Sequence, residues 1–232
     1  MHVMDHRGVI SIAAGSLLYK LITSCDQLGR NQPARMSRIN ALMKQHQKDH
    51  GTTHRMPALR KEDLTKDGWS CLTGKVVKAA NTRCLLPFLL ELAEDYFDGT
   101  DSYDVSIRKV FTSLVEIQKV LYSSGCFLAD TDVDKLDALF RRVGRHWQNL
   151  RHLSSLRKEN NWHISPKVHY MLHLPAQARL INPIFTQCYT EESMVGRVCK
   201  IWHSCANGPY QSTIQRTALL KYWVGFELRV TE

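Results

Sequence analysis

Apolar residues recur at spacings of three and four along most of this 232-residue chain, and this periodicity limits its fold more than any other feature. A helix is predicted after the turn at Gly99–Ser102 and another after Asp130–Asp132, because acidic and hydroxyl side chains cap helix starts. Further helices are predicted over residues 9–22, 33–49, 75–97, from about 191, and over 212–228. The start of the nearly continuous apolar run 9–22 also fits a strand. The sequence therefore predicts a mainly α fold.

Changes in sequence character divide the chain into three predicted segments. Residues 1–25 hold a short polar start and a buried helix, and residues 26–160 form a basic helical domain. The boundary near 160 follows the polar stretch Lys158–Asn161, which has no periodicity. Residues 161–232 form the last segment, in which residues 181–190 are expected to be extended.

The chain is basic, with 31 Lys and Arg residues against 22 Asp and Glu residues and a formal net charge of +9. Such a balance favours an acidic partner, most often nucleic acid or an anionic membrane surface. Two predicted helices carry basic faces that would contact DNA phosphates without reading sequence: Arg35, Arg38, Lys44 and Lys48 on the first, and Arg141, Arg142, Arg145 and Arg151 on the second. The alternative is a helical interaction module whose charges are simply solvated.

Seven scattered cysteines and the absence of any C-x-x-C pair argue against a disulfide framework. Reduced thiols fit a nuclear or cytoplasmic protein, and a secreted one is not expected. No apolar run reaches the roughly 18 residues of a membrane span. Cys199, His203 and Cys205 have zinc-ligand chemistry, with Cys188 as the nearest candidate for a fourth ligand. Without a second pair of ligands at the usual spacing, buried thiols beside a histidine are the favoured interpretation.

His169 and His173 are four residues apart, so on a helix they would share one face. Both rings could then approach one metal ion or one phosphate group, with Lys167 close by in the sequence. The alternative is a helix whose apolar residues pack while the histidines form local hydrogen bonds. The alternative is favoured, because histidine pairs at this spacing are common by chance.

Glu191 and Glu192 follow Thr190, a residue type that caps helices. Acidic residues in a first helical turn complement the helix dipole, which is the simpler explanation for the pair. The functional alternative is that one carboxylate binds a divalent cation in a cleft. Mg²⁺ usually requires further oxygen ligands, so one glutamate pair cannot hold it unaided.

Two N-terminal stretches resemble DDE transposases of the CACTA and KDZ kind, whose RNase H-like catalytic core is interrupted by a helical insertion. Met1-His2, followed by Gly8 and the helix through Gly15–Leu18, resembles the segment that follows the second catalytic aspartate of that family. Lys78–Arg83 resembles a K-A-x-x-x-R stretch inside the helical insertion.

Two later stretches continue the resemblance in the same order. Lys167, His169 and His173 are similar to a K-x-H-x-x-x-H segment that precedes the last core elements. Glu192, ahead of Met194-Val195-Gly196, resembles the final catalytic glutamate, which opens a helix. The resemblance implies that Glu192, or less well Glu191, is a metal-binding catalytic acid and that the basic residues position DNA.

The resemblance also implies a fold and its limits. The expected architecture is a helical insertion-type bundle with a partial RNase H-like (α/β) remnant at the C-terminus. The two other catalytic aspartates of the family would precede Met1, because Asp5 and His6 follow the Met-His pair. We therefore expect a truncated transposase-derived protein that associates with DNA and is inactive alone. Its partners would be the missing N-terminal half or a second copy. Mg²⁺ or Mn²⁺ would serve the intact ancestor, with no tight binding here.

Overall fold

The structure is a computed structural model that describes residues 3–4, 8–51, 56–73, 79–186, 201, 205, 216–217 and 219–220. The chain divides into two compact units, Met1–Thr186 and Gln187–Glu232. The helices of the first unit are α1 (Val9–Ser24), α2 (Gln32–Asp49), α3 (Ala79–Tyr96), α4 (Ser102–Ser123), α5 (Asp130–Leu156), α6 (Pro166–Met171) and α7 (Leu174–Ala178). Short 3₁₀ turns are η1 (Asp26–Leu28), η2 (Lys61–Leu64) and η3 (Pro183–Thr186). The predicted mainly α fold is confirmed.

The described residues include one small sheet of two antiparallel strands, β1 (Thr65–Lys66) and β2 (Trp69–Ser70). The strands pair Thr65 with Ser70 and Lys66 with Trp69, so they form a short hairpin. Asp67 and Gly68 make the turn, and both have positive φ values, 51° and 79°. The hairpin lies against α1 through β2. It is a local turn of the chain.

Helix starts follow their sequence signals in most cases. Residues 9–24 are helical from the first apolar residue, so the strand alternative is wrong. Asn31 caps α2, because its Oδ1 accepts a hydrogen bond from the Ala34 N–H at 3.0 Å. Asp101 caps α4 in the same way, with 2.7 Å between its Oδ1 and the Asp104 nitrogen.

Five predicted elements differ from the structure or lie partly outside the described residues. The N-cap of α5 is Ala129, and Asp130 lies in the first helical turn instead of before it. Residues 183–186, predicted as extended, form a 3₁₀ turn because Phe185 and Thr186 bond back to Asn182 and Pro183. The start of the predicted helix 75–97, and most of those from 191 and over 212–228, fall outside the described residues.

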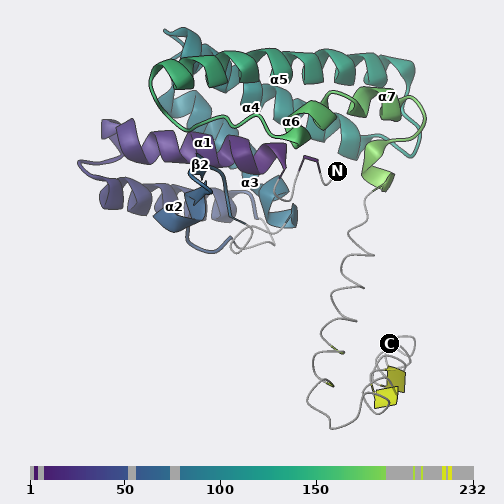
Figure 1. Cartoon of the computed structure of the whole chain (residues 1–232), viewed down its shortest axis with the longest axis horizontal. Helices are drawn as coiled ribbons and strands as arrows, with labels where there is room; N and C mark the ends of the chain where they lie inside the picture. Colours follow the sequence, from purple (N-terminus) through teal and green to yellow (C-terminus); the bar gives the residue numbers. More distant parts are fainter. Residues whose placement is uncertain are drawn as a thin grey trace. The chain divides into compact units, whose positions relative to one another are not determined.

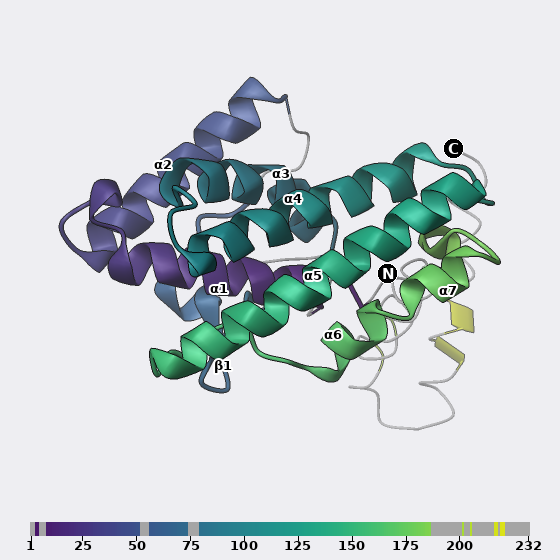
Figure 2. The ribbon, with the colours of Figure 1, turned by 90° about the horizontal axis from the view of Figure 1, so that it is seen from above.

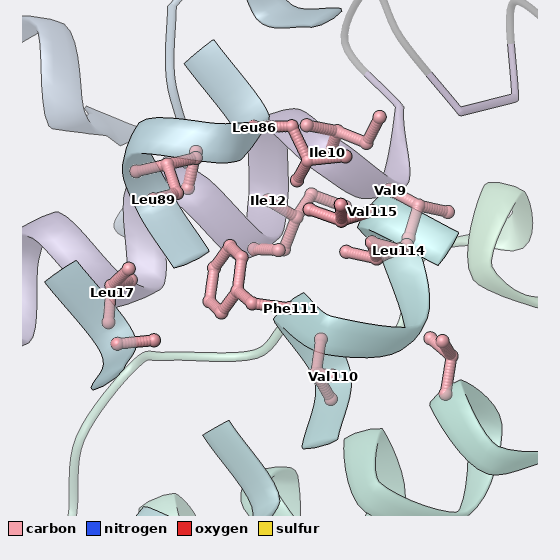
Figure 3. Packing of buried hydrophobic residues seen from close by; sticks show 14 of the residues in the cluster. Val9, Ile10, Ile12, Leu17, Leu86, Leu89, Val110, Phe111, Leu114 and Val115 are labelled. Carbon is pink, nitrogen blue, oxygen red and sulfur yellow. The ribbon is translucent and has the colours of Figure 1, made fainter. Parts of the chain in front are cut away.

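Helix α1 is the centre of the first unit. Twelve of its 16 residues are buried, and it packs on α2, α3 and α6 and on the hairpin. Figure 3 shows Ile10 and Ile12 of α1 meeting Leu86 of α3 and Phe111 of α4 in one hydrophobic cluster. Helix α4 packs on both α3 and α5, with α5 along its outer side (Figure 1, Figure 2). The core is therefore continuous from α1 to α5.

Residues 159–162, which follow α5 and are called the polar strap here, hold the helices together. The Trp162 N–H donates to the Ser16 Oγ at 2.9 Å, and the Trp162 indole donates to the Tyr103 hydroxyl at 3.1 Å. Asn161, which is buried, accepts from the Ser70 hydroxyl at 2.6 Å. Glu159 forms an ion pair of 2.6 Å with Lys20. The strap therefore ties the end of α5 back to α1, α4 and the hairpin.

The strap includes residue 160, and the first compact unit extends past this residue to Thr186. The predicted limits between 1–25, 26–160 and 161–232 rest on changes in sequence character. They remain predictions.

Three aspartates crowd the start of α4 and make stability depend on pH. The pKa of Asp104 is raised to about 6, first by burial and then by the charges and hydrogen bonds of Asp101 and Asp98. The folded state therefore holds this proton more tightly than the unfolded state, whose pKa is near 3.8. The ionised carboxylate thus lowers the free energy of unfolding, increasingly so as the pH rises from about 4 through 6.

We expect Asp104→Asn to remove this penalty. The amide carries no charge and can donate the hydrogen bonds that the protonated carboxyl donates. After discounting for solvent screening, the variant should be about 1 kcal/mol more stable than the wild type at pH 7.5 and no more stable at pH 4. Urea unfolding at the two pH values measures this difference. An equal difference at both values would contradict the assignment.

Candidate nucleic-acid interface

Two stripes of polar side chains face each other where α4 and α5 pack. On α4 the stripe has the spacing i, i+4, i+7, and on α5 it has the spacing i, i+3, i+4, i+7, so each occupies one helix face. The helices run antiparallel, because the Ser102 end of α4 meets Asn149 near the end of α5. We name this surface the α4–α5 seam, and its residues are Ser102, Ser106, Lys109, Arg142, Arg145, His146 and Asn149.

Hydrogen bonds fix one end of the α4–α5 seam. The Asn149 amide donates to the Ser102 Oγ at 2.9 Å and to the Ser106 Oγ at 2.8 Å. The Ser106 hydroxyl lies 3.1 Å from the His146 Nδ1. Because its oxygen already accepts from Asn149, the hydroxyl hydrogen is available to donate to an unprotonated Nδ1. The ring is thus held in one orientation.

Positive charge dominates the other end of the seam. The pKa of His146 is lowered, first by burial and then by the charges of Arg145, Lys109 and Arg142. All three cationic side chains therefore act on one ring, and Lys109, Arg142 and Arg145 are exposed. None of the three forms an ion pair with a carboxylate in the part of the chain that the structure describes. Unneutralised, exposed cations on one face form a surface suited to phosphate groups.

The other two predicted residues of α5, Arg141 and Arg151, both have partners within the protein. Arg141 is exposed, but its guanidinium pairs with the Asp137 carboxylate at 2.7 Å. Arg151 is half-buried, and its guanidinium carbon lies 4.5 Å from the centre of the Trp69 ring. The Arg151 side chain therefore covers the hairpin through a cation–π contact. Of the four predicted residues on α5, Arg142 and Arg145 are thus the ones positioned to meet a phosphate.

The prediction that Arg35 lies on the exposed basic face of α2 is wrong. Arg35 is 7% exposed. Its guanidinium donates to the Gly29 carbonyl at 2.8 Å and the Ile22 carbonyl at 3.2 Å, and it pairs with Asp26. The side chain closes the turn between α1 and α2 by satisfying carbonyls at the end of α1. The role of Arg35 is therefore to hold this turn, not to contact DNA.

Arg38, Lys44 and Lys48 are exposed on α2, as predicted. Arg38 lies beside Tyr96, whose pKa is raised by burial and partly lowered again by the guanidinium. Helix α2 packs on α1, whereas the seam lies on α4 and α5, at the opposite side of the first unit in Figure 1. The two basic regions are thus separate surfaces.

The structure brings His169 and His173 together. Their Nε2 atoms lie 3.1 Å apart, and the ring centroids are 4.7 Å apart. One helix does not carry both, since α6 ends at Met171 and His173 is the N-cap of α7. Lys167 lies in the first turn of α6 and has an interaction of its own. No described carboxylate or thiol joins this pair to complete a set of three metal ligands.

The remaining candidate residues lie mostly outside the described part of the chain. These residues are Glu191, Glu192, Cys188, Cys199, His203, Lys78, Met1 and His2. Cys205, from the predicted zinc cluster, is described and is buried. Residues 15–18 belong to the first stretch that resembles the transposase family, and they are buried in helix α1.

The predicted site residues do not include Lys109, His146 or the serines of the seam. The spacing of Ser102, Ser106 and Lys109 is a signal for one helix face, but a polar face alone predicts only solvent exposure. The seam becomes visible only when α4 and α5 are paired in the correct register.

Among the described residues, no helix has both the length and the apolar character to cross a membrane. Comparisons with protein-family models, with curated proteins and with solved structures gave no match to this chain.

Proposed function

We propose that this protein binds nucleic acid non-specifically, with the α4–α5 seam as the contact surface for the phosphate backbone. The observation that carries the proposal is the set of three exposed cations, Lys109, Arg142 and Arg145, which lie around His146 and have no described acidic partners. The net charge of +9 adds long-range attraction to any polyanion. Arg38, Lys44 and Lys48 on α2 supply a separate weaker surface.

Salt dependence is the measurement that tests this proposal. Three phosphate contacts should give a slope of log Kobs against log[salt] of about −2.7 on duplex DNA. Affinity for a short duplex should then fall about 40-fold between 50 and 200 mM salt. A flat response would favour the alternative, a helical interaction module without a nucleic-acid role.

Removing two seam charges should weaken binding in a defined way. Arg142→Gln with Arg145→Gln should lower affinity by about tenfold or more at 100 mM salt and reduce the steepness of the slope by about 2. Glutamine keeps the helix propensity of α5, so the fold should not change. Fluorescence anisotropy with a labelled duplex across a salt series measures both quantities.

A matched control separates the seam from net charge. Lys119 on α4 and Lys135 on α5 both pair with Glu116, at 3.1 Å and 3.3 Å. Lys119→Gln with Lys135→Gln removes the same number of charges from the same two helices, but both of these lysines are paired with a carboxylate. Its slope should change by less than half as much as that of the seam variant. Equal losses for the two variants would show that net charge, not the seam, governs binding.

We also propose descent from a DDE transposase, including an RNase H-like remnant in the C-terminal region and a metal-binding role for Glu192 with Mg²⁺ or Mn²⁺. The order of motifs from Met1-His2 to Glu192 supports this proposal. Paramagnetic broadening by Mn²⁺ in NMR spectra tests it. Broadening should centre on Glu192 and disappear in Glu192→Gln, and broadening that ignores this substitution would contradict the assignment.

A further inference from the structure

A cluster of metal-ligand side chains lies where the end of α2 meets α3, away from the seam. His46, in the last turn of α2, packs against Phe88 of α3 with 5.5 Å between ring centroids. Its side chain is only 7% exposed, so the ring has little freedom. The His46 Nδ1 lies 2.8 Å from the Glu91 Oε2 of α3. Of this ligand pair, His46 is thus held in place by the core.

His50 completes the cluster from the C-cap position of α2. Its Nε2 lies 3.6 Å from the Glu91 Oε1, so each oxygen of one carboxylate faces a different imidazole. The two rings lie with their centroids 4.3 Å apart. One ligand atom from each of His46, His50 and Glu91 lies within 4.8 Å of the others. In the described part of the chain, no other group of histidine, cysteine or acidic residues reaches three ligands at this spacing.

We propose that His46, His50 and Glu91 bind one divalent transition-metal ion, with Zn²⁺ as the best fit. Tetrahedral Zn²⁺ with bonds of 2.0–2.2 Å places its ligand atoms about 3.3 Å apart. The two nitrogen–oxygen separations, 2.8 Å and 3.6 Å, end on different oxygens of Glu91, and with one oxygen from Glu91 the three ligand atoms lie within 4.8 Å of one another. Closing the site requires small movements of His50 and Glu91, whose side chains are 59% and 48% exposed.

Ligand chemistry and local charge both favour this ion. Two imidazoles with one carboxylate suit zinc and its neighbours, whereas Mg²⁺ and Ca²⁺ prefer oxygen ligands alone. The carbonyl groups at the C-terminal end of α2 carry partial negative charge, which favours a cation at that position. Three protein ligands leave a fourth position facing solvent, as in zinc sites that bind water or an external ligand.

The site joins two helices that otherwise meet little. Helix α2 packs on α1 and η1, and α3 packs on α1 and α4. A bound ion would therefore link the end of α2 to α3 and stabilise that contact. This inference is independent of the nucleic-acid proposal, since the residues of the seam take no part in it.

Co²⁺ absorption tests the ligand set directly. Titration of the full chain with Co²⁺ should give the visible bands of a four-coordinate ion, without the near-ultraviolet bands that thiolate ligands add. This distinction matters because the chain has seven cysteines. Zn²⁺ should displace the Co²⁺ and remove the visible bands.

Two variants and one control complete the test. His50→Ala and Glu91→Gln should each lower Zn²⁺ affinity by about tenfold or more, and their exposure means that the fold should persist. His152→Ala, at an exposed histidine of α5, should leave the affinity unchanged. Equal Zn²⁺ affinity in His50→Ala and in the wild type would overturn the proposal. Thiolate bands that persist in His50→Ala would also overturn it.

Discussion

Replacement of Trp162 by alanine is expected to lower the free energy of unfolding of the first compact unit by about 4 kcal/mol. The indole is fully buried, and it meets Trp147 edge-on with ring centroids 5.3 Å apart. Phe111 of α4 lies on another side, at 6.4 Å. Removing the ring leaves a cavity among three helices that cannot all move inward, so both the lost burial and the cavity contribute.

Backbone strain makes Trp162 more sensitive than an ordinary core residue. Its φ is 57°, in the left-handed region that costs a non-glycine residue about 1 kcal/mol or more. Packing of the indole and its hydrogen bond to Tyr103 offset this cost in the folded protein. Alanine retains the Cβ atom, and hence the strain, while it loses the packing.

Urea unfolding followed by circular dichroism measures the effect of Trp162→Ala. The slope of the transition should stay constant, because the surface exposed on unfolding changes little. Phe127→Ala is the matched control, since Phe127 is 77% exposed, and its loss should stay within about 0.5 kcal/mol. A loss below about 1.5 kcal/mol for Trp162→Ala would show that the strap is not part of the cooperative core.

The helices could be predicted from the sequence because their signals are local. Apolar spacing and caps such as Asn31 and Asp101 act within one or two helical turns, so no knowledge of the fold is needed. The pairing of Arg141 with Asp137 is equally local, at the i, i+4 spacing of helix ion pairs. That pairing could have removed Arg141 from the predicted DNA-contacting set.

The exposure of Arg35 was predicted from its charge, against its position on α2. It lies four residues before the buried Ile39, so it belongs to the buried side of α2. A buried arginine is expected only where several acceptors converge. Here the acceptors are carbonyls of residues 22 and 29 and the Asp26 carboxylate, and the turn between α1 and α2 brings them together. The sequence does not reveal that convergence.

Both candidate sites depend on helix pairings that sequence periodicity cannot supply. His46 and Glu91 are separated by 45 positions, and the pair forms only because α2 and α3 both pack on α1. Likewise, Ser106 meets His146 across 40 positions through the packing of α4 on α5. The polar strap at 159–162 has no periodicity, and polar residues without periodicity usually indicate a loop. Its side chains are instead bonded into the core.

Replacement of Gly15 by alanine is expected to destabilise the first unit by about 2 kcal/mol. An added Cβ would lie 2.4 Å from the Cα and 2.5 Å from the backbone nitrogen of Cys71. Backbone bonds hold Cys71 against α1, since the Leu72 N–H donates to the Ser11 carbonyl at 3.0 Å and the Cys71 N–H donates to Leu64. The strand end therefore cannot shift without losing these bonds.

Helix propensity opposes this loss but does not cancel it. Alanine is favoured over glycine inside a helix by about 1 kcal/mol, whereas overpacking against a fixed backbone costs about 1–3 kcal/mol and sometimes more. Gly125→Ala is the matched control, because nothing lies within 4 Å of an added Cβ at that position. Urea unfolding should show a change of at most about 0.5 kcal/mol for Gly125→Ala. A Gly15→Ala variant as stable as the wild type would mean that the hairpin does not pack this closely on α1 in solution.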